Sequence, residues 1–156
     1  MDETYIKVGG RWVYLYRAMD KAGGTVDFFL SRNRDVNAAK AFLGRAMKNT
    51  RQPTKITLDA YAASHRAVRE MKETGELSQG VRVRSSQYLN NLIAQDYHRV
   101  KQRVRPMLGF KRFENAAVTI SGIELVEKIK KGQFKTGKFA SRKATMSERW
   151  SAALAA

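Results

Sequence analysis

The sequence has no cysteine and only two histidines among its 156 residues. Without cysteine, disulfides, thiolate nucleophiles and the common zinc sites are excluded. With two histidines, a histidine-rich metal site is not expected either. Any metal ion would therefore have to be held by oxygen ligands.

Long apolar runs are also missing. No run approaches the ~18 residues that a membrane span requires, and no segment resembles the apolar core of a signal peptide. The hydrophobic content of 43% is nevertheless sufficient for one domain with a real core. We expect one globular, cytoplasmic domain that does not enter a membrane.

Acidic residues are scarce relative to basic ones. Fourteen Asp and Glu face thirty Lys and Arg, which gives a formal charge of +16 and a sequence pI near 10.4. Such a field favours a polyanion, and nucleic acid is the first candidate. An anionic membrane surface is the alternative partner, and a ribosomal-type RNA-binding protein would explain the charge equally well.

The pattern of β-branched, aromatic and turn residues predicts strands first and helices later. The expected strands cover residues 4–8, 11–19, 25–31, 55–59 and 81–85. The expected helices cover residues 35–49, 60–75, about 88–104 and 113–131. Glycine-containing turns join the first three strands, so we expect them to form an antiparallel meander. The last two helices are separated by "RPMLGF", where Pro106 and Gly109 should interrupt any continuous helix.

A meander followed by alternating helices and strands is the element order of the ribonuclease H-like fold. We therefore predict an α/β domain over residues 1–134, with a mixed sheet and helices on both faces. Residues 135–156 are predicted to be a basic tail with a short terminal helix. Trp12, Tyr14 and Tyr16 alternate along one strand face, a pattern typical of core or sheet packing rather than of base stacking.

Two aspartates lie where such a sheet binds ligands. Asp59 ends the apolar strand "ITLD", and ligands of α/β sheets bind at the carboxyl ends of strands. Asp2 lies in the first strand. For Asp59 the alternative is a helix N-cap, and for Asp2 it is a solvated residue near the amino terminus.

Four stretches carry a family resemblance: "MDETYIKVGGRWVYLYRAMDKAGGTVDFFLS", "ITLDAYAA", "YLNNLIAQD" and "RPMLGFKRFENAAVTISGIELVEKIKKGQF". In this order they resemble the catalytic domain of bacterial insertion-sequence transposases of the family numbered six, from residue 1 to about 134. These are DDE enzymes, in which three carboxylates on a ribonuclease H-like fold hold two divalent metal ions. The resemblance implies that Asp2 and Asp59 are the first two catalytic carboxylates and metal ligands.

The third carboxylate of the family is a glutamate separated from the second aspartate by 34 residues. Residues 60–93 fill this interval, so the glutamate is expected at position 94, where the chain has Ala94. Asp96 is a poor substitute, because residues two apart on a helix point about 200° apart. The implied cofactor is Mg²⁺ or Mn²⁺, two ions in an intact site, and we expect their binding here to be weak or absent.

Residues around position 94 are suited to contact DNA phosphates. Asn90, Asn91, His98 and Lys101 share a helix face with position 94, and further basic residues follow. The predicted DNA-binding residues are Asn90, Asn91, His98, Arg99, Lys101, Arg103, Arg105 and Lys111. The alternative is a solvated basic face, and for His98 an exposed imidazole. His65 is expected to be structural or solvated.

The resemblance implies a DNA transposase, a polynucleotidyl transferase that cleaves and joins strands, in this chain inactive or weakly active because of Ala94. An inactive DNA-binding remnant or co-opted domain is the alternative. A Holliday-junction resolvase would share fold and charge but not "RPMLGFK" or "KGQF". The implied partner is double-stranded DNA, at transposon ends and target, with a homo-oligomer when active and a bacterial, nucleoid-associated location. Family members carry an upstream helix-turn-helix region, so the chain is expected to be a fragment.

Overall fold

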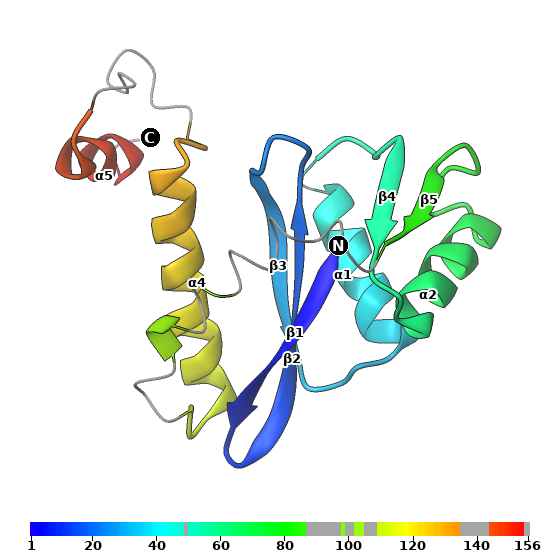
Figure 1. Ribbon diagram of the computed structural model, residues 1–156, viewed down its shortest axis with the longest axis horizontal. Coiled ribbons are helices and arrows are strands. Elements are labelled where there is room, and N and C mark those ends of the chain that lie inside the picture. Colours follow the sequence, from blue (N-terminus) through cyan, green and yellow to red (C-terminus); the bar gives the residue numbers. More distant parts are fainter. Residues whose placement is uncertain (49, 87–97, 99–101, 105–108, 135–143, 155–156) are drawn as a thin grey trace. The chain divides into compact units, whose positions relative to one another are not determined.

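The computed structural model describes residues 1–48, 50–86, 98, 102–104, 109–134 and 144–154 (Figure 1). The chain divides into two compact units, Met1–Phe113 and Glu114–Ala156, which are called the first and the second unit. The predicted boundary near residue 134 stays a prediction.

The first unit opens with an antiparallel meander of β1 (Asp2–Val8), β2 (Arg11–Met19) and β3 (Thr25–Ser31), in the order β1-β2-β3. This part of the prediction is confirmed. Gly9 and Gly10 form the β1–β2 turn with φ values of 54° and 77°, which other residues rarely adopt. The β2–β3 pairing ends at Tyr14 and Ser31, so residues 11–13 of β2 pair with β1 alone.

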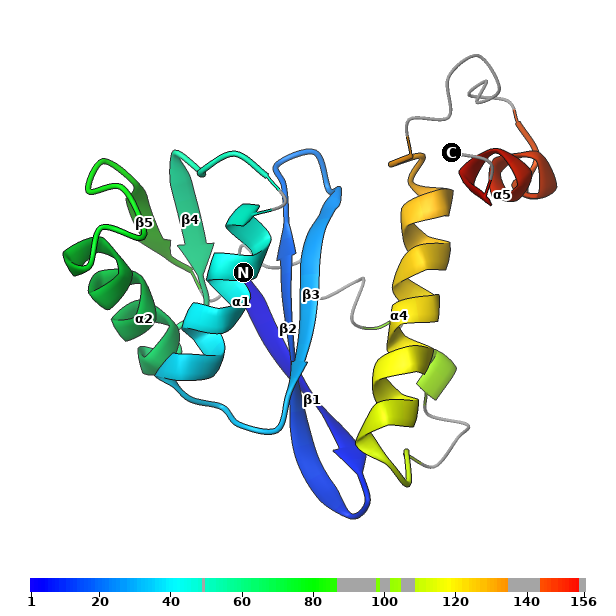
Figure 2. The ribbon, with the colours of Figure 1, turned by 180° about the vertical axis from the view of Figure 1, so that it is seen from behind.

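Helix α1 (Val36–Lys48) packs on β2 and β3 and lies on one face of the meander (Figure 2). It begins where it does because the Asp35 Oδ1 accepts a hydrogen bond from the Ala38 N–H at 2.8 Å, a side-chain cap of the first turn. Its apolar face buries Phe42, whose ring stacks on Tyr16 of β2 with 5.9 Å between the centroids. Arg45 holds the buried Asp27 of β3 through two contacts, at 2.9 and 3.0 Å.

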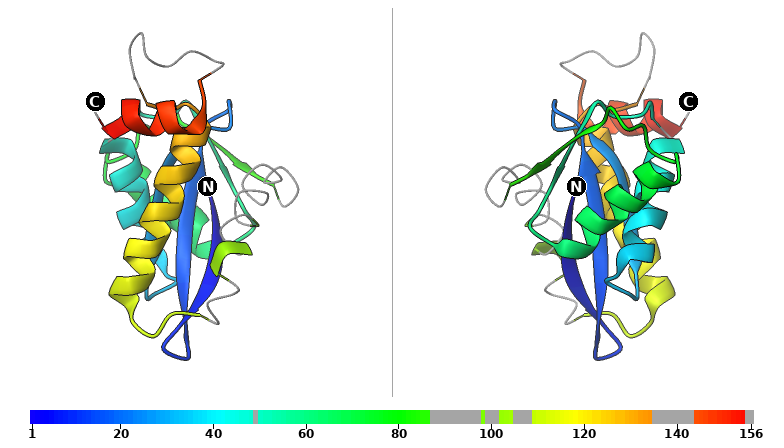
Figure 3. Two further views of the ribbon diagram at one scale, coloured as in Figure 1. Left: turned by 90° about the vertical axis from the view of Figure 1, so that its left-hand side faces the viewer. Right: turned by 90° about the vertical axis from the view of Figure 1, so that its right-hand side faces the viewer.

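A βαβ unit follows the meander. β4 (Lys55–Leu58) pairs in parallel with β5 (Arg82–Ser85), and α2 (Ala62–Glu73) connects them, ending before Gly75 with its φ of 78°. α1 and α2 pack against each other (Figure 3, right). A parallel pair requires such a crossover, which agrees with the predicted element order.

One core joins these elements. The amino group of Met1 donates a hydrogen bond to the Thr57 carbonyl at 2.7 Å and so links the start of β1 to β4. The buried apolar residues between the helices and the strands include Tyr16, Phe42, Leu43, Ile56, Leu58, Val68, Met71 and Leu77. The mixed α/β class is confirmed. Among the described residues the strands form two sheets, β1-β2-β3 and β4-β5, so the single mixed sheet is not observed, and helices on both faces stay a prediction.

The second unit contains α5 (Met146–Leu154) and all of α4 (Phe113–Lys130) except its first residue. Arg149 of α5 donates to the carbonyl of Lys130 at 3.0 Å. Of the helix predicted over 88–104, residues 98 and 102–104 are helical, and the others lie outside the described residues. Within the described part of the chain, no helix is long and apolar enough to cross a membrane.

The sequence predicted core or sheet packing for Trp12, and the structure gives packing within the sheet, on Tyr5, without burial in the core. Tyr16 is fully buried and Tyr14 packs against the core, but Trp12, on the same strand face, is 54% exposed. The reason is tertiary: Trp12 lies beyond the last β2–β3 pair, where the hairpin extends past α1 (Figures 1 and 2). The alternation correctly predicted that the three aromatic residues share a strand face, but not where α1 stops covering that face.

Truncation of Phe42 tests the packing of α1. Phe42→Ala should lower the free energy of unfolding by about 3–5 kcal/mol, because it removes a fully buried ring and leaves a cavity. Phe42→Leu, which keeps most of the apolar volume, should cost less than about 1.5 kcal/mol. Urea denaturation of the three proteins measures both values, and a loss below about 1 kcal/mol for Phe42→Ala would contradict the packing described.

Candidate active site

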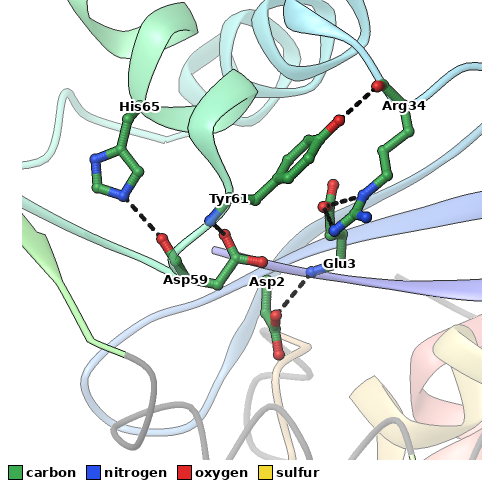
Figure 4. Close-up of polar contacts among 6 residues, drawn as sticks. All are labelled: Asp2, Glu3, Arg34, Asp59, Tyr61 and His65. Carbon is green, nitrogen blue, oxygen red and sulfur yellow. Dashed lines mark hydrogen bonds and ion pairs between the residues drawn. The ribbon is translucent and has the colours of Figure 1, made fainter.

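The two aspartates singled out by the sequence lie at neighbouring strand ends. Asp2 is the first residue of β1, and Asp59 directly follows β4. The bond from Met1 to Thr57 brings these two ends together, and Figure 4 shows both side chains near the start of β1. Residues 57 positions apart in sequence are thus adjacent at one edge of the fold.

Electrostatics support this proximity. Burial lowers the pKa of the Met1 amino group, while the negative charges of Asp2 and Asp59 both act to raise it. The amino group of Met1 therefore interacts electrostatically with both carboxylates. Like charges brought together in this way favour a bound cation.

Asp59 is held in place by its own loop and by α2. Its Oδ1 accepts a hydrogen bond from the Tyr61 N–H at 3.3 Å, and the His65 Nε2 bonds to its carbonyl oxygen at 2.8 Å (Figure 4). A carbonyl can only accept, so Nε2 of His65 carries the proton. The helix N-cap is Tyr61, so the N-cap interpretation of Asp59 was wrong: its carboxylate closes an Asx turn two residues earlier.

Asp2 is half-buried within a paired strand, opposite Arg17 of β2, and is not a solvated terminal residue. Its Oδ1 accepts the N–H of Glu3 at 2.9 Å. Because the side chains of a strand alternate, Asp2 and Glu3 point to opposite faces. Glu3 therefore has a separate role.

Glu3 anchors a cluster beside the aspartates. Its carboxylate, 2% exposed, pairs with the Arg34 guanidinium through Nη2 and through Nε at 2.5 Å. The guanidinium also lies 3.8 Å from the Tyr61 ring centroid, and the Tyr61 hydroxyl donates to the Arg34 carbonyl at 2.8 Å. Since Tyr61 also holds Asp59, this cluster connects β1 and the start of α1 to the Asp59 loop.

Burial raises the pKa of Glu3, and the hydrogen bond and charge of Arg34 act in the opposite direction, while the charge of Asp59 raises it further. Sequence reasoning missed Glu3, Arg34 and Tyr61, because no spacing rule brings residues from three elements together. His65 had a usable signal: side chains near a helix start lean back toward the N-terminus, here toward Asp59.

Asp2 and Asp59 offer carboxylate oxygens, which are the type of ligand that hard divalent cations prefer. Two carboxylates are fewer than the usual set of ligands. Within the described ranges, no group of three His, Cys, Asp or Glu side chains is placed to hold a metal ion. Position 94 lies outside these ranges.

The other predicted contacts are only partly described. His98 is exposed and its Nε2 lies 2.8 Å from the Gln102 Nε2. Arg103 is half-buried and Lys111 is exposed. Asn90, Asn91, Ala94, Arg99, Lys101 and Arg105 lie outside the described residues, so their DNA contacts stay predictions.

Comparison with known proteins places the chain in a family. Residues 1–133 match the DDE domain of IS240-type transposases, and the chain belongs to this family. The family implies a ribonuclease H-like fold, in agreement with the meander and the βαβ unit. The predicted transposase and insertion-sequence classification is thereby confirmed.

The similar proteins include two transposases of Staphylococcus aureus. The transposase for insertion sequence-like element IS431mec of strain N315 is 36% identical over 126 residues, which cover 81% of this chain and 54% of that protein. The transposase for insertion sequence element IS257 in transposon Tn4003 gives the same values. The chain thus spans about half the length of these curated relatives.

A third similar protein is uncharacterized protein pYV0051 of Yersinia pseudotuberculosis serotype I (strain IP32953). It is 36% identical over 90 residues, which cover 56% of this chain and 84% of that protein. No solved structure matches the chain significantly.

Removal of Arg34 tests the cluster. Arg34→Ala should destabilise the protein by about 1–3 kcal/mol near pH 7, because the buried Glu3 carboxylate loses its charged donor. A raised carboxylate pKa means that the folded state binds the proton more tightly, so stability falls as pH rises from 4.5 through the folded pKa. Arg34→Ala should raise the pKa of Glu3 further, so the stability that this variant loses relative to the parent should grow as the pH rises. Urea denaturation from about pH 4 to pH 8 measures it.

Glu3→Gln provides the control for this prediction. In the double variant Arg34→Ala with Glu3→Gln, the added pH dependence should vanish, because residue 3 no longer titrates. An equal pH dependence of the Arg34→Ala loss in both backgrounds would show that Glu3 does not depend on Arg34.

Proposed function

We propose that the chain is the catalytic domain of a DNA transposase of the insertion-sequence family numbered six, built to cleave and join DNA strands, with its activity reduced by Ala94. The main observation behind this proposal is that Asp2 and Asp59 lie at adjacent strand ends in a chain that belongs to the DDE family. The S. aureus relatives, described as transposases, support this proposal.

The proposed roles of the residues follow from their chemistry. Asp2 and Asp59 would hold the divalent metal that DDE transposases generally use, which when bound activates the attacking oxygen and stabilises the leaving oxygen at phosphorus. Tyr61 and His65 fix one carboxylate oxygen and the backbone carbonyl of Asp59, and its other carboxylate oxygen is the proposed metal ligand. The Glu3–Arg34 pair keeps Tyr61 in place.

Ala94 is the reason for proposing low activity. From the resemblance we expect the third carboxylate of the family at this position, and a methyl group offers no oxygen ligand. Loss of residues that only orient a metal ligand already costs about 10- to 100-fold in affinity or activity. Loss of a ligand itself should cost more.

A second candidate function rests on the same alanine together with the charge of +16. The domain would then bind DNA without cleaving it, as a remnant or a co-opted domain. The proposed partner in both cases is double-stranded DNA. Homo-oligomer formation is proposed for an active form.

DNA binding is tested by its dependence on salt. The chain should bind duplex DNA with little sequence preference, because phosphates attract its excess of basic residues. If about six phosphates are neutralised, the logarithm of affinity should fall with the logarithm of salt concentration at a slope near −5. Fluorescence anisotropy in about 50 to 200 mM salt measures the slope, and an affinity insensitive to salt would reject the partner.

Restoration of the third carboxylate tests the catalytic proposal. Ala94→Glu should increase binding of Mn²⁺ or Mg²⁺, since a third carboxylate adds oxygen ligands beside Asp2 and Asp59. At about 100 times the dissociation constant, binding contributes about 2.7 kcal/mol, equivalent to a rise in melting temperature of roughly 5–10 °C. Thermal melts with and without metal should show a smaller rise for the parent chain.

Ala94→Glu combined with Asp59→Asn is the matched control, because it keeps the new glutamate and removes one proposed ligand. Its metal-induced shift should return to that of the parent. Equal shifts in all three proteins would mean that position 94 does not complete a site with Asp59. Metal-dependent nicking by the parent that is lost in Asp59→Asn would instead contradict the proposed loss of activity.

A further inference from the structure

The far end of the β1–β2 hairpin carries an exposed aromatic pair. Tyr5 of β1 and Trp12 of β2 are 56% and 54% exposed, and their rings meet in a T-shaped contact with 5.0 Å between centroids. Lys7, directly opposite Trp12 in the ladder, places its ammonium 5.8 Å from the Trp12 centroid. The pair therefore has a defined geometry although the aromatic surface faces solvent.

The core does not need this pair. On the same face, Tyr16 is buried beneath α1 and Tyr14 is half-buried, whereas Tyr5, which lies opposite Tyr14, and Trp12 are exposed. A large exposed aromatic surface is costly in water and usually marks an interaction site. The structure provides this surface on a strand pair fixed by the ladder of β1 and β2.

The exposed charges of residues 4–19 and of residues 109–113 are all positive. Residues 4–19 contain no acidic residue, and this segment contributes the exposed Lys7 and Arg11. Residues 109–113, "GFKRF", dock beside β1 through Gly9 N–H to the Phe110 carbonyl at 2.6 Å and Phe110 N–H to the Lys7 carbonyl at 3.1 Å. They add the exposed Lys111 and Arg112. The hairpin end thus combines flat aromatic rings with four cations.

This combination matches unpaired DNA better than the alternatives. Bases of a single strand expose ring faces that stack on aromatic side chains, while the neighbouring phosphates pair with cations. Bases inside a duplex have both faces covered by neighbouring pairs. A second copy of this chain docked on the same patch would bring like charges together, which disfavours self-association.

We propose that Tyr5 and Trp12, with Lys7 and Arg11, form a binding surface for unpaired nucleotides of a DNA strand. This rests on the proposed function, in which opening of one strand allows neighbouring base pairs to separate. The surface is a binding site, not part of the aspartate pair, and it gives the strand-cleaving domain a means to hold single-stranded DNA.

Two matched probes test the surface: a blunt DNA duplex and the same duplex with an unpaired thymine tail. The parent should bind the tailed duplex more tightly. Trp12→Ala should weaken binding to the tailed duplex by about 5- to 100-fold, the usual effect of losing a stacked base, and leave the blunt duplex nearly unchanged. Trp12→Phe should retain part of the preference.

The two tryptophans allow a test that does not depend on the stability of Trp12→Ala. Trp12 and Trp150 are the only ones in the sequence, so Trp150→Phe leaves Trp12 as the sole emitter and Trp12→Phe is the reverse control. The tailed duplex should quench the fluorescence of Trp12 more than the blunt duplex does. Trp150 should respond equally to both.

Several outcomes would overturn the inference and leave the proposed function intact: equal binding of both probes by the parent, a preference unchanged in Trp12→Ala, or equal quenching of Trp12 by both probes. Loss of a dimer in Trp12→Ala with its DNA preference retained would assign the surface to a second copy. A shift of Trp12 emission by anionic phosphatidylserine vesicles but not by DNA would assign it to a membrane. Failure of the parent to bind either DNA would instead reject the proposed function.

Discussion

The packing of α1 on the meander is the constraint on which the rest of the first unit depends. Phe42 stacks on Tyr16, and Arg45 holds the buried Asp27, so the helix is fixed on β2 and β3. Its start, capped by Asp35, places the preceding Arg34 over Tyr61 and against Glu3. The Asp59 loop therefore depends on the packing of α1 on the meander, although neither Phe42 nor Arg45 belongs to that loop.

The cluster around Arg34 offsets the free-energy cost of burying the Glu3 carboxylate. Glu3 is buried, and burial of a carboxylate is unfavourable unless its charge is compensated. Arg34 provides this compensation and at the same time contacts Tyr61, which holds Asp59. The stability of the domain and the position of the Asp59 loop are thus coupled, because the Arg34 guanidinium contributes to both.

The face that carries Tyr16, Tyr14 and Trp12 changes its environment along one strand. It is core under α1, half-buried beside Arg34 and exposed at the hairpin end, where aromatic rings and cations meet. A single alternating strand can therefore serve both the stability of the domain and contact with a partner. The aspartates and the proposed nucleotide surface both involve β1, one at its start and the other in its second half.

The sequence by itself determined most of the local structure. Alternation, turn glycines and helical spacing set the meander, α1, the βαβ unit and α4, because these depend on contacts between near neighbours. It also singled out Asp2 and Asp59 as candidate catalytic residues. The tertiary structure alone decided that the strand ends carrying these two acids lie together, that Tyr61 and His65 bond to Asp59 next to the Glu3–Arg34 pair, and that Trp12 is exposed. Those outcomes depend on which distant segments pack together and on where a helix stops covering a strand, and no local pattern of residues encodes either.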